Sequence, residues 1–203
     1  MRLEPTTLRG RHVTLEPLQR EHAAALVEAG NRDRSTYGFT AVPPDLPAME
    51  QYIDGLLADA ERGSVLPFAQ RRTGGQLVGC TRYLNVLWAA GRPTPVEVEI
   101  GGTWLAADAQ RTPVNTEAKL LLLTQAFEQL EVFRVAICTD ARNQRSRDAI
   151  ERLGATFEGI LRNHRMNMGH LTEPGLPRDT AAYSVIPSEW PAIKARLQER
   201  LGV

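Results

Sequence analysis

Apolar residues recur along the chain with two periods, one of two residues and one close to four. Alternation of polar and apolar residues, or a short apolar run, predicts a β-strand, and apolar residues at helical spacing predict an amphipathic helix. Seven segments fit strands: residues 12–15, 65–71, 77–87, 96–105, 132–139, 156–168 and 180–186. Five segments fit helices: residues 21–29, 48–60, 116–130, 143–153 and 188–201. This order predicts an α/β protein whose sheet contains strands of mixed direction, with helices on its faces.

Glycines and capping residues mark the ends of these elements. Gly74-Gly75, between the second and third strands, predicts a β-hairpin. Gly30 is expected to end the first helix, and Gly154 to end the fourth in a left-handed conformation. Ser188 has the residue type and position of an N-cap for the last helix.

The composition fits a single domain spanning residues 1–203. Apolar residues make up 42% of the chain and charged residues 24%, which is typical of a globular protein. A chain of 203 residues can also bury a sizeable core. We therefore expect one α/β domain with a mixed, twisted sheet of about seven strands flanked by helices.

Charge is balanced, because Lys plus Arg and Asp plus Glu both number 24. This balance argues against nucleic acid or an anionic membrane as a partner. No apolar leader or spanning segment is evident, so we expect a cytoplasmic protein. Cys80 and Cys138 lie in strand-like apolar runs and are expected to be buried free thiols. No zinc-ligand spacing occurs, so no metal site is expected.

A candidate phosphate site lies between the strand 96–105 and the helix 116–130. The first amides of a helix lack intrahelical partners and carry partial positive charge, so they attract a pyrophosphate. Arg111 adds a cation there. Taken alone, such a strand–turn–helix is common and usually binds nothing. The candidate cofactor-binding residues of this loop are Gln110, Arg111, Thr112, Val114, Asn115 and Thr116.

A second pattern lies at the next strand–helix junction. The strand 132–139 is followed by Asp140-Ala141-Arg142-Asn143-Gln144-Arg145-Ser146 and a helix. Here the chain resembles the GNAT superfamily of N-acetyltransferases, whose pattern is Asn-x-x-Ser after a central strand. The earlier loop is similar to that superfamily's pyrophosphate loop, Gln/Arg-x-x-Gly-x-Gly/Ala. The two motifs stand at the correct separation and in the correct elements, and the resemblance covers nearly the whole chain.

Further stretches resemble one branch, the ribosomal-protein N-terminal acetyltransferases of the RimJ/RimL type. Asn115-Thr116-Glu117-Ala118 falls where that branch commonly has Ala-Thr-Glu-Ala. Glu99-Ile100-Gly101 and Arg178-Asp179-Thr180 are also similar to it. One departure is Pro113, which stands at a usual glycine and has no amide to donate. Its fixed φ still suits the first turn of a helix.

The resemblance implies a role for each candidate residue. Acetyl-CoA, as cosubstrate, would lie in a cleft between two splayed central strands. Asn143 would bind the pantetheine arm, and Ser146 would protonate the departing thiolate. Glu99 is the first candidate for the general base that an amine nucleophile requires, and Glu97 is the second. The other implied contacts are the backbones of Val98 and Ile100 to the pantetheine, and Glu97, Arg178 and Asp179 to the acceptor.

Each of these residues also has an ordinary structural interpretation. Asn143 has the residue type of a helix N-cap, and Ser146 that of a surface hydroxyl. Glu97 and Glu99, which share one face of a strand, fit solvated carboxylates equally well. Arg178-Asp179 fits a local ion pair of little energetic value.

The function implied is transfer of an acetyl group from acetyl-CoA to a primary amine, and a protein N-terminal amine is the first expectation. An alternative is acetylation of a small amine such as a polyamine, an amino acid or an antibiotic. A third is a non-catalytic acyl-CoA-binding module, which the proline at position 113 keeps open. A homodimer is the default expectation for the oligomeric state.

Overall fold

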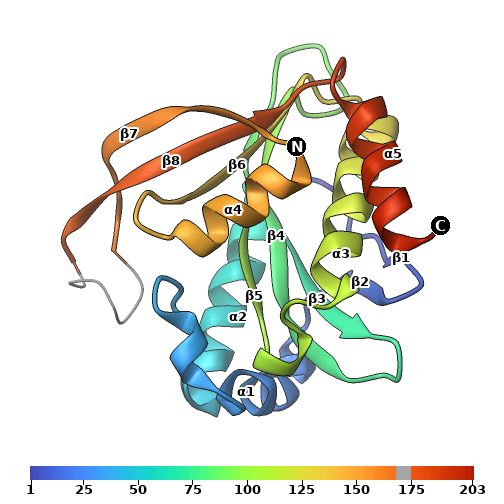
Figure 1. Cartoon of the computed structure of the whole chain (residues 1–203). Coiled ribbons are helices and arrows are strands. Elements are labelled where there is room, and N and C mark those ends of the chain that lie inside the picture. Colours follow the sequence, from blue (N-terminus) through green and yellow to red (C-terminus); the bar gives the residue numbers. More distant parts are fainter. Residues whose placement is uncertain (168–174) are drawn as a thin grey trace.

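The sheet runs through the whole molecule and carries helices on both faces (Figure 1). The computed structural model describes residues 1–167 and 175–203. Eight strands follow the order β1-β2-β3-β4-β5-β6-β8-β7. Only β5 and β6 pair in parallel among the described strands. The strands are β1 (Leu8–Arg9), β2 (Val13–Pro17), β3 (Leu66–Arg72), β4 (Leu77–Leu87), β5 (Glu97–Leu105), β6 (Arg134–Asp140), β7 (Thr156–Met166) and β8 (Pro177–Val185).

The mixed α/β sheet is therefore confirmed, and the expected number of strands is corrected from about seven to eight. The additional strand is β1, whose two residues are too short for any periodicity to reveal. It exists because Leu8 pairs with Leu15 of β2. The predicted end of the β7 segment at residue 168 lies outside the described residues.

Alternation along β4 explains why both faces of the sheet are covered. Arg82 points to one face, where its guanidinium donates to the hydroxyl of Tyr52 on α2 at 2.8 Å. Tyr83 points to the other face, where its hydroxyl donates to the carbonyl of Leu122 on α3 at 2.5 Å. Consecutive strand residues therefore anchor helices on opposite faces. The helices are α1 (Ala23–Asn31), α2 (Leu46–Glu61), α3 (Pro113–Thr124), α4 (Gln144–Leu153) and α5 (Trp190–Leu201).

Two residues predicted to end or to cap a helix do not do so. Gly30 does not end α1, which continues to Asn31. A side chain at Gly30 would meet Val42 at 3.0 Å, so close packing explains this glycine. The last helix begins at Trp190 with Glu189 as its N-cap residue, and Ser188 does not cap it.

The central helix is also longer at its start than predicted. It begins at Pro113 rather than at Thr116, so the proline that the sequence assigned to the loop lies in the first helical turn, which its fixed φ suits. At its other end it continues as a π-helical turn over Gln125–Gln129. The two cysteines are free as predicted, with Cys80 buried and Cys138 partly buried.

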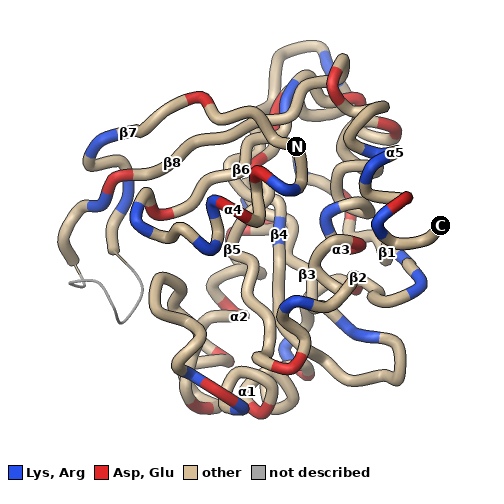
Figure 2. The backbone as a smooth tube through the Cα atoms, viewed as in Figure 1, with Lys and Arg blue, Asp and Glu red and all other residues tan. Residues whose placement is uncertain are grey.

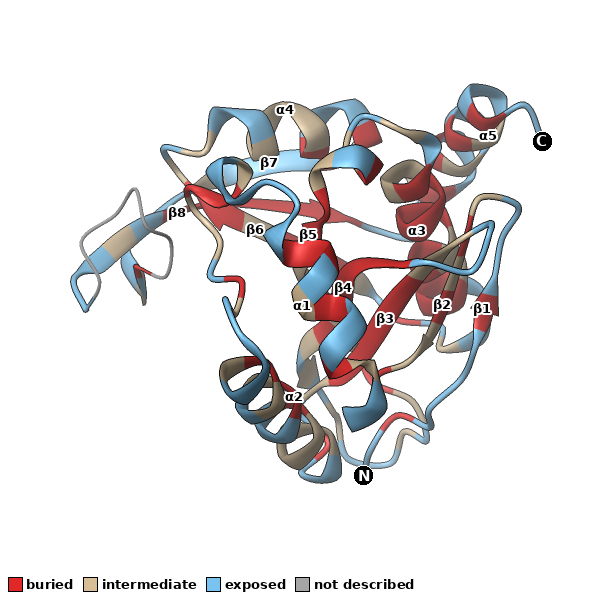
Figure 3. Cartoon of the chain, turned by 90° about the horizontal axis from the view of Figure 1, so that it is seen from below, coloured by how far each residue is buried: buried red, intermediate tan, exposed pale blue. Residues whose placement is uncertain are grey.

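Burial is uneven across the sheet (Figure 3). Strands β3 and β4 are largely buried, whereas most residues of β7 are exposed. Positive and negative residues alternate along the backbone without a large region of one sign (Figure 2). Among the described residues, no helix is long and apolar enough to cross a membrane.

Candidate functional site

The two central parallel strands separate after a short paired section. Their registered pairs are Glu97–Arg134, Val98–Val135 and Glu99–Ala136. Beyond these pairs β5 continues to Leu105 and β6 to Asp140, and the two strands diverge (Figure 1). Backbone groups on this edge of β5 therefore lack a neighbouring strand, which makes them available to a ligand.

Of the two backbone positions that the sequence singled out, Val98 lies inside the paired section and Ile100 is the first residue beyond it. Both side chains are buried, so any contact with a ligand in the opening comes from the main chain. Ile100 is the better placed of the two.

The loop before α3 is held by its own side chains. Thr112 is the N-cap residue: its hydroxyl donates to the carbonyl of Ala109 at 2.7 Å and accepts from the amide of Val114 at 3.4 Å. Pro113 has no amide, so its presence in the first turn leaves no unsatisfied donor there. Asn115 and Thr116, also in the first turn, are partly exposed.

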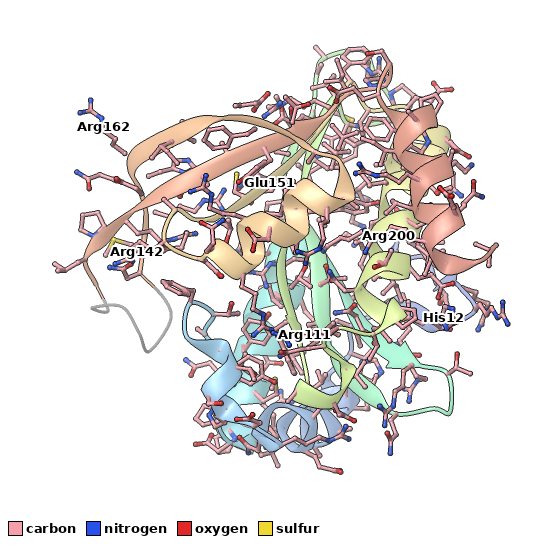
Figure 4. All side chains as sticks on the ribbon, viewed as in Figure 1. His12, Arg111, Arg142, Glu151, Arg162 and Arg200 are labelled. Carbon is pink, nitrogen blue, oxygen red and sulfur yellow. The ribbon has the colours of Figure 1, made fainter. Side chains whose placement is uncertain are left out.

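Arg111 has an unusual backbone conformation, with φ 60° in the left-handed region. Residues other than glycine rarely adopt this backbone conformation, which costs them about 1 kcal/mol. Its guanidinium is exposed, and no described residue forms an ion pair with it. Figure 4 shows Arg111 where the end of β5 meets the start of α3. A cation held at a helix N-terminus suits a phosphate group.

Gln110 connects three parts of the molecule. Its side-chain amide donates to the carbonyl of Leu105 at 2.8 Å and to the hydroxyl of Thr36 at 3.1 Å. Its carbonyl oxygen accepts from Arg145 of α4. The Gln110 side chain therefore positions the loop, and it brings the second cation, Arg145, to the same place.

The Asn-x-x-Ser motif forms the start of α4. The Asn143 side-chain oxygen accepts from the amide of Ser146 at 3.1 Å, so Asn143 does cap the helix. This bond uses only the side-chain oxygen of Asn143. The side-chain nitrogen of Asn143 has no hydrogen bond to a described residue. Ser146 is partly exposed, and no described residue bonds its hydroxyl. The capping interpretation is confirmed, and a donor remains free for a ligand.

Glu99 is almost fully buried and strongly paired. Its two carboxylate oxygens accept from Arg165 of β7 at 2.9 and 2.6 Å, and one also accepts from the side chain of Asn85 at 2.8 Å. The bidentate pair raises the pKa of the Arg165 guanidinium. Burial, with Glu99 nearby, raises the pKa of the Cys138 thiol to about 11, so this thiol is protonated at neutral pH.

The acceptor residues that the sequence singled out contact other groups. Glu97 lies 3.4 Å from Arg134, which also binds Glu158. Arg178 lies 3.9 Å from Asp140, and Asp179 accepts from the amide of Asn163 at 2.8 Å. The prediction of a local ion pair between Arg178 and Asp179 is therefore wrong, because Arg178 faces Asp140 and Asp179 binds the amide of Asn163.

Burial lowers the pKa of the Arg178 guanidinium, although Asp140 opposes this effect. One of its nitrogens is buried without a hydrogen-bond partner among the described residues. This nitrogen is the one that faces Asp140, and Arg178 lies on β8, which β6 separates from the opening.

Glu117, in the stretch that resembles Ala-Thr-Glu-Ala, has a structural contact. Its carboxylate accepts three backbone amides of the β1–β2 turn, those of Arg11, His12 and Val13, at 2.8, 2.6 and 2.8 Å. This residue of the motif fixes the edge of the sheet to α3, away from the opening.

Sequence reasoning missed Arg145, Arg165 and Asn85. Arg145 stands inside the quoted motif, so its position was available as a signal. Arg165 and Asn85 reach Glu99 from residues 66 and 14 positions away along the chain. No local pattern reports contacts of this kind.

The chain belongs to the GNAT acetyltransferases: residues 12–156 match the Acetyltransferase (GNAT) domain family. A protein of Bacillus subtilis (strain 168) named as a ribosomal N-acetyltransferase, YdaF, is 37% identical over 89 residues. That match covers 44% of this chain and 45% of YdaF, less than half of its length.

Solved structures resemble nearly the whole chain. A GCN5-related N-acetyltransferase from Brucella melitensis has a TM-score of 0.82 at 30% identity, covering 98% of this chain and 86% of that one. An acetyltransferase of T. thermophilus reaches 0.80 at 36% identity, covering 99% and 100%. Mycobacterium smegmatis RimJ, solved with CoA-disulfide, has a TM-score of 0.80 at 22% identity over 98% and 95%, a likeness of fold.

Proposed function

We propose that this protein transfers the acetyl group of acetyl-CoA to a protein N-terminal amine. The observation that carries the proposal is the divergence of β5 and β6 beside the N-terminus of α3. It leaves main-chain groups for an amide-containing arm and helix amides for a pyrophosphate within one region. Membership of the GNAT family supports the same reading.

The residues available suit acetyl-CoA. Arg111 and Arg145 supply cations for its phosphates, and the amides at the start of α3 add donors. Ile100 and the free amide nitrogen of Asn143 flank the opening from its two sides. Acetyl-CoA supplies the activated acetyl thioester, and the chain's own residues orient it and move protons.

Two proton transfers are assigned to the chain. Glu99 accepts the proton of the acceptor amine, directly or through water, since a carboxylate retains acceptor sites beyond its bonds to Arg165 and Asn85. Arg165 orients this carboxylate through two hydrogen bonds. Ser146, whose hydroxyl has no described partner, donates a proton to the departing sulfur.

A peptide acceptor is favoured by the open face next to the site. Strand β7 is largely exposed, which leaves an open surface beside the site for an extended peptide. The name of YdaF, a ribosomal N-acetyltransferase, supports a protein acceptor.

Calorimetric titration with acetyl-CoA tests the cofactor part. Asn143→Ala removes both the helix cap and the free donor, whereas Asn143→Asp keeps a capping oxygen, removes the donor and adds a negative charge. We expect saturable binding by the wild type and a loss of about tenfold in both variants, the equivalent of about 1.4 kcal/mol. Binding that survives in Asn143→Asp would assign Asn143 to capping alone.

Mass spectrometry of peptide mixtures tests the acceptor. With acetyl-CoA present, we expect acetylation at free N-termini and none on the same peptides blocked at the N-terminus. Turnover of polyamines, amino acids or antibiotics with no peptide product would replace the acceptor class. Acetyl-CoA binding with no product from any amine would indicate a non-catalytic acyl-CoA-binding protein.

A further inference from the structure

Lys119 of α3 is a buried amine without a carboxylate partner. It is only 9% exposed, and its ammonium donates to the hydroxyl of Thr103 at 2.7 Å and to that of Thr81 at 3.5 Å. These two hydroxyls are themselves hydrogen-bonded at 2.8 Å. None of the ion pairs between described residues includes Lys119. Lysines are rarely this buried unless a negative group accompanies them, so the arrangement is unusual.

The Lys119 ammonium lies on the helix whose first turn forms the proposed phosphate site. Figure 1 shows α3 leading back from the phosphate loop along the sheet. The partner Thr103 is near the end of β5, beyond the section that pairs with β6. Lys119 is about 9 Å along the axis from Pro113, because an α-helix rises about 1.5 Å per residue. Side chains on a helix lean toward its N-terminus, so the ammonium is displaced toward the loop.

Charged groups on the elements around α3 have partners of their own or lie too far away to act on Lys119. Glu117 accepts three amides of the β1–β2 turn. Tyr83 of β4 donates its hydroxyl to a carbonyl of α3, and burial raises its pKa, so it is neutral. Lys194 of α5 pairs with Glu128 of the π-helical turn. The other titratable residues of these elements are Arg9 (β1), Arg11 and His12 (β1–β2 turn), Glu16 (β2), Cys80 and Arg82 (β4), Glu97 and Glu99 (β5), and Arg196, Glu199 and Arg200 (α5).

Burial alone therefore determines the protonation of this amine. It lowers the pKa of the Lys119 ammonium to about 7, so charged and neutral forms coexist near neutral pH. A negative charge brought close to a buried amine favours its charged form. At an effective dielectric constant of about 20, one charge about 12 Å away changes such a protonation equilibrium about tenfold.

We propose that Lys119 takes up a proton from solvent when acetyl-CoA binds, and that acetyl-CoA binds more tightly when Lys119 is protonated. The ligand phosphates at the start of α3 supply the negative charge, and the two effects are equal by linkage. The inference rests on the proposed acetyl-CoA site and adds a dependence on pH to it. Arg111 and Arg145 do not produce this dependence, because a guanidinium stays charged throughout this pH range.

The direction of the dependence follows from the order of the two pKa values. The pKa of Lys119 is higher in the complex than in the free protein, since the phosphates favour the ammonium. The extra affinity is therefore fully present below the pKa of the free protein and is lost as the pH rises through the pKa of the complex.

NMR of the lysine side chains tests the proposal directly. The chain has two lysines, Lys119 and Lys194, so the protein labelled with ¹³C at lysine Cε gives one signal for each. The signals are followed from about pH 6 to about pH 10 without ligand, with saturating acetyl-CoA, and with S-acetylpantetheine, which has the thioester arm but no phosphates. We expect acetyl-CoA to raise the titration midpoint of Lys119 by about one pH unit and S-acetylpantetheine to leave it unchanged. The Lys194 signal is the internal control and is expected to be the same in all three samples.

Calorimetry gives an independent measurement. Between about pH 6 and about pH 9, the affinity of the wild type for acetyl-CoA is expected to fall about tenfold more than that of Lys119→Met. Titration of the ligand phosphates is common to both proteins and cancels in this comparison. Lys194→Met is expected to keep the dependence of the wild type, and Lys119→Leu repeats the test if methionine disturbs the packing.

The failures of the inference and of the proposed function are distinguishable. An unchanged Lys119 midpoint with acetyl-CoA bound, or equal pH dependences in the wild type and Lys119→Met, would overturn the inference and leave the acetyl-CoA site in place. An equal shift with S-acetylpantetheine would also overturn it, because the phosphates would not be the cause. Absence of acetyl-CoA binding at every pH would remove the proposed site and the inference together.

Discussion

The sheet differs on the two sides of the β5–β6 opening. Strands β3 and β4 are mostly buried, with helices anchored on both of their faces by neighbouring residues such as Arg82 and Tyr83. Strand β7, on the other side, is mostly exposed and carries Arg165, which reaches back across the sheet to Glu99. The first half derives its stability from a closed core, whereas the second half presents charged groups on an open surface. Substitutions in the second half are therefore expected to cost less stability than the removal of a buried contact in the first half.

The largest expected effect is in the first half, at Glu117. Glu117→Ala leaves three backbone amides without their acceptor, and we expect a loss of about 4 kcal/mol in the free energy of unfolding. Urea denaturation measures it. The exposed Glu61→Ala on α2 is the control and is expected to change stability by less than about 0.5 kcal/mol. Similar values for the two variants would show that the turn amides find water instead.

Lys119 tests how closed that core is. Its ammonium donates to the hydroxyl of Thr103 at 2.7 Å, and burial lowers the pKa of this ammonium to about 7. In the unfolded chain a lysine has a pKa of about 10.4. Between these pH values the unfolded chain binds more protons, so stability from this residue rises with pH and reaches its full value above the unfolded pKa. Below the pKa of Lys119 in the folded protein, its ammonium is charged in both states, and the full cost of burying that charge lowers the stability.

Lys119→Met removes this dependence. We expect it to stabilise the protein by about 2 kcal/mol at neutral pH, with an advantage over the wild type that shrinks by about 1.4 kcal/mol per pH unit as the pH rises above 7. Urea midpoints between neutral and alkaline pH measure it, and Lys194→Met, on the surface, is the control. A constant difference between the two proteins would mean that Lys119 stays protonated in the core.

One ion pair joins the two halves, from Glu99 on β5 to Arg165 on β7. Glu99→Gln is expected to cost about 2 kcal/mol of stability, because it leaves the partly exposed Arg165 without its carboxylate. Arg165→Gln should cost a similar amount, and the double variant less than the sum. Acetyl transfer separates the roles. A base at Glu99 predicts a much larger loss of kcat in Glu99→Gln than in Arg165→Gln, and equal losses would make the pair structural.

The smallest expected change in stability is at Arg111. Arg111→Gly relieves the left-handed backbone and is expected to stabilise the protein by up to about 1 kcal/mol. It also removes the exposed cation, so we expect weaker acetyl-CoA binding with a shallower dependence on salt. Arg111→Gln keeps the strain and removes the charge. Unchanged acetyl-CoA binding in both variants would exclude Arg111 from the phosphate site.

The sequence was sufficient for most of the fold and for the outline of the candidate site. Periodicity found β3, β4 and α4, because each is long enough to show a clear pattern. It missed β1, which has only two residues, and placed the start of α3 three residues late because the proline was assigned to the loop. The sequence did not predict which side chains pair with one another, since the contact of Glu99 with Arg165 depends on how strands far apart in the sequence are arranged in the sheet.

The short parallel register of β5 and β6 has a consequence for how the molecule fluctuates. Three registered pairs join the strands directly at this seam, and the chain crosses it through α3. Opening at the seam therefore disrupts fewer backbone bonds than opening between β3 and β4, and it requires less free energy than global unfolding. Amide hydrogens of Val98 and Val135 should exchange with solvent before those in the middle of β4, and a ligand that bridges the seam should slow them.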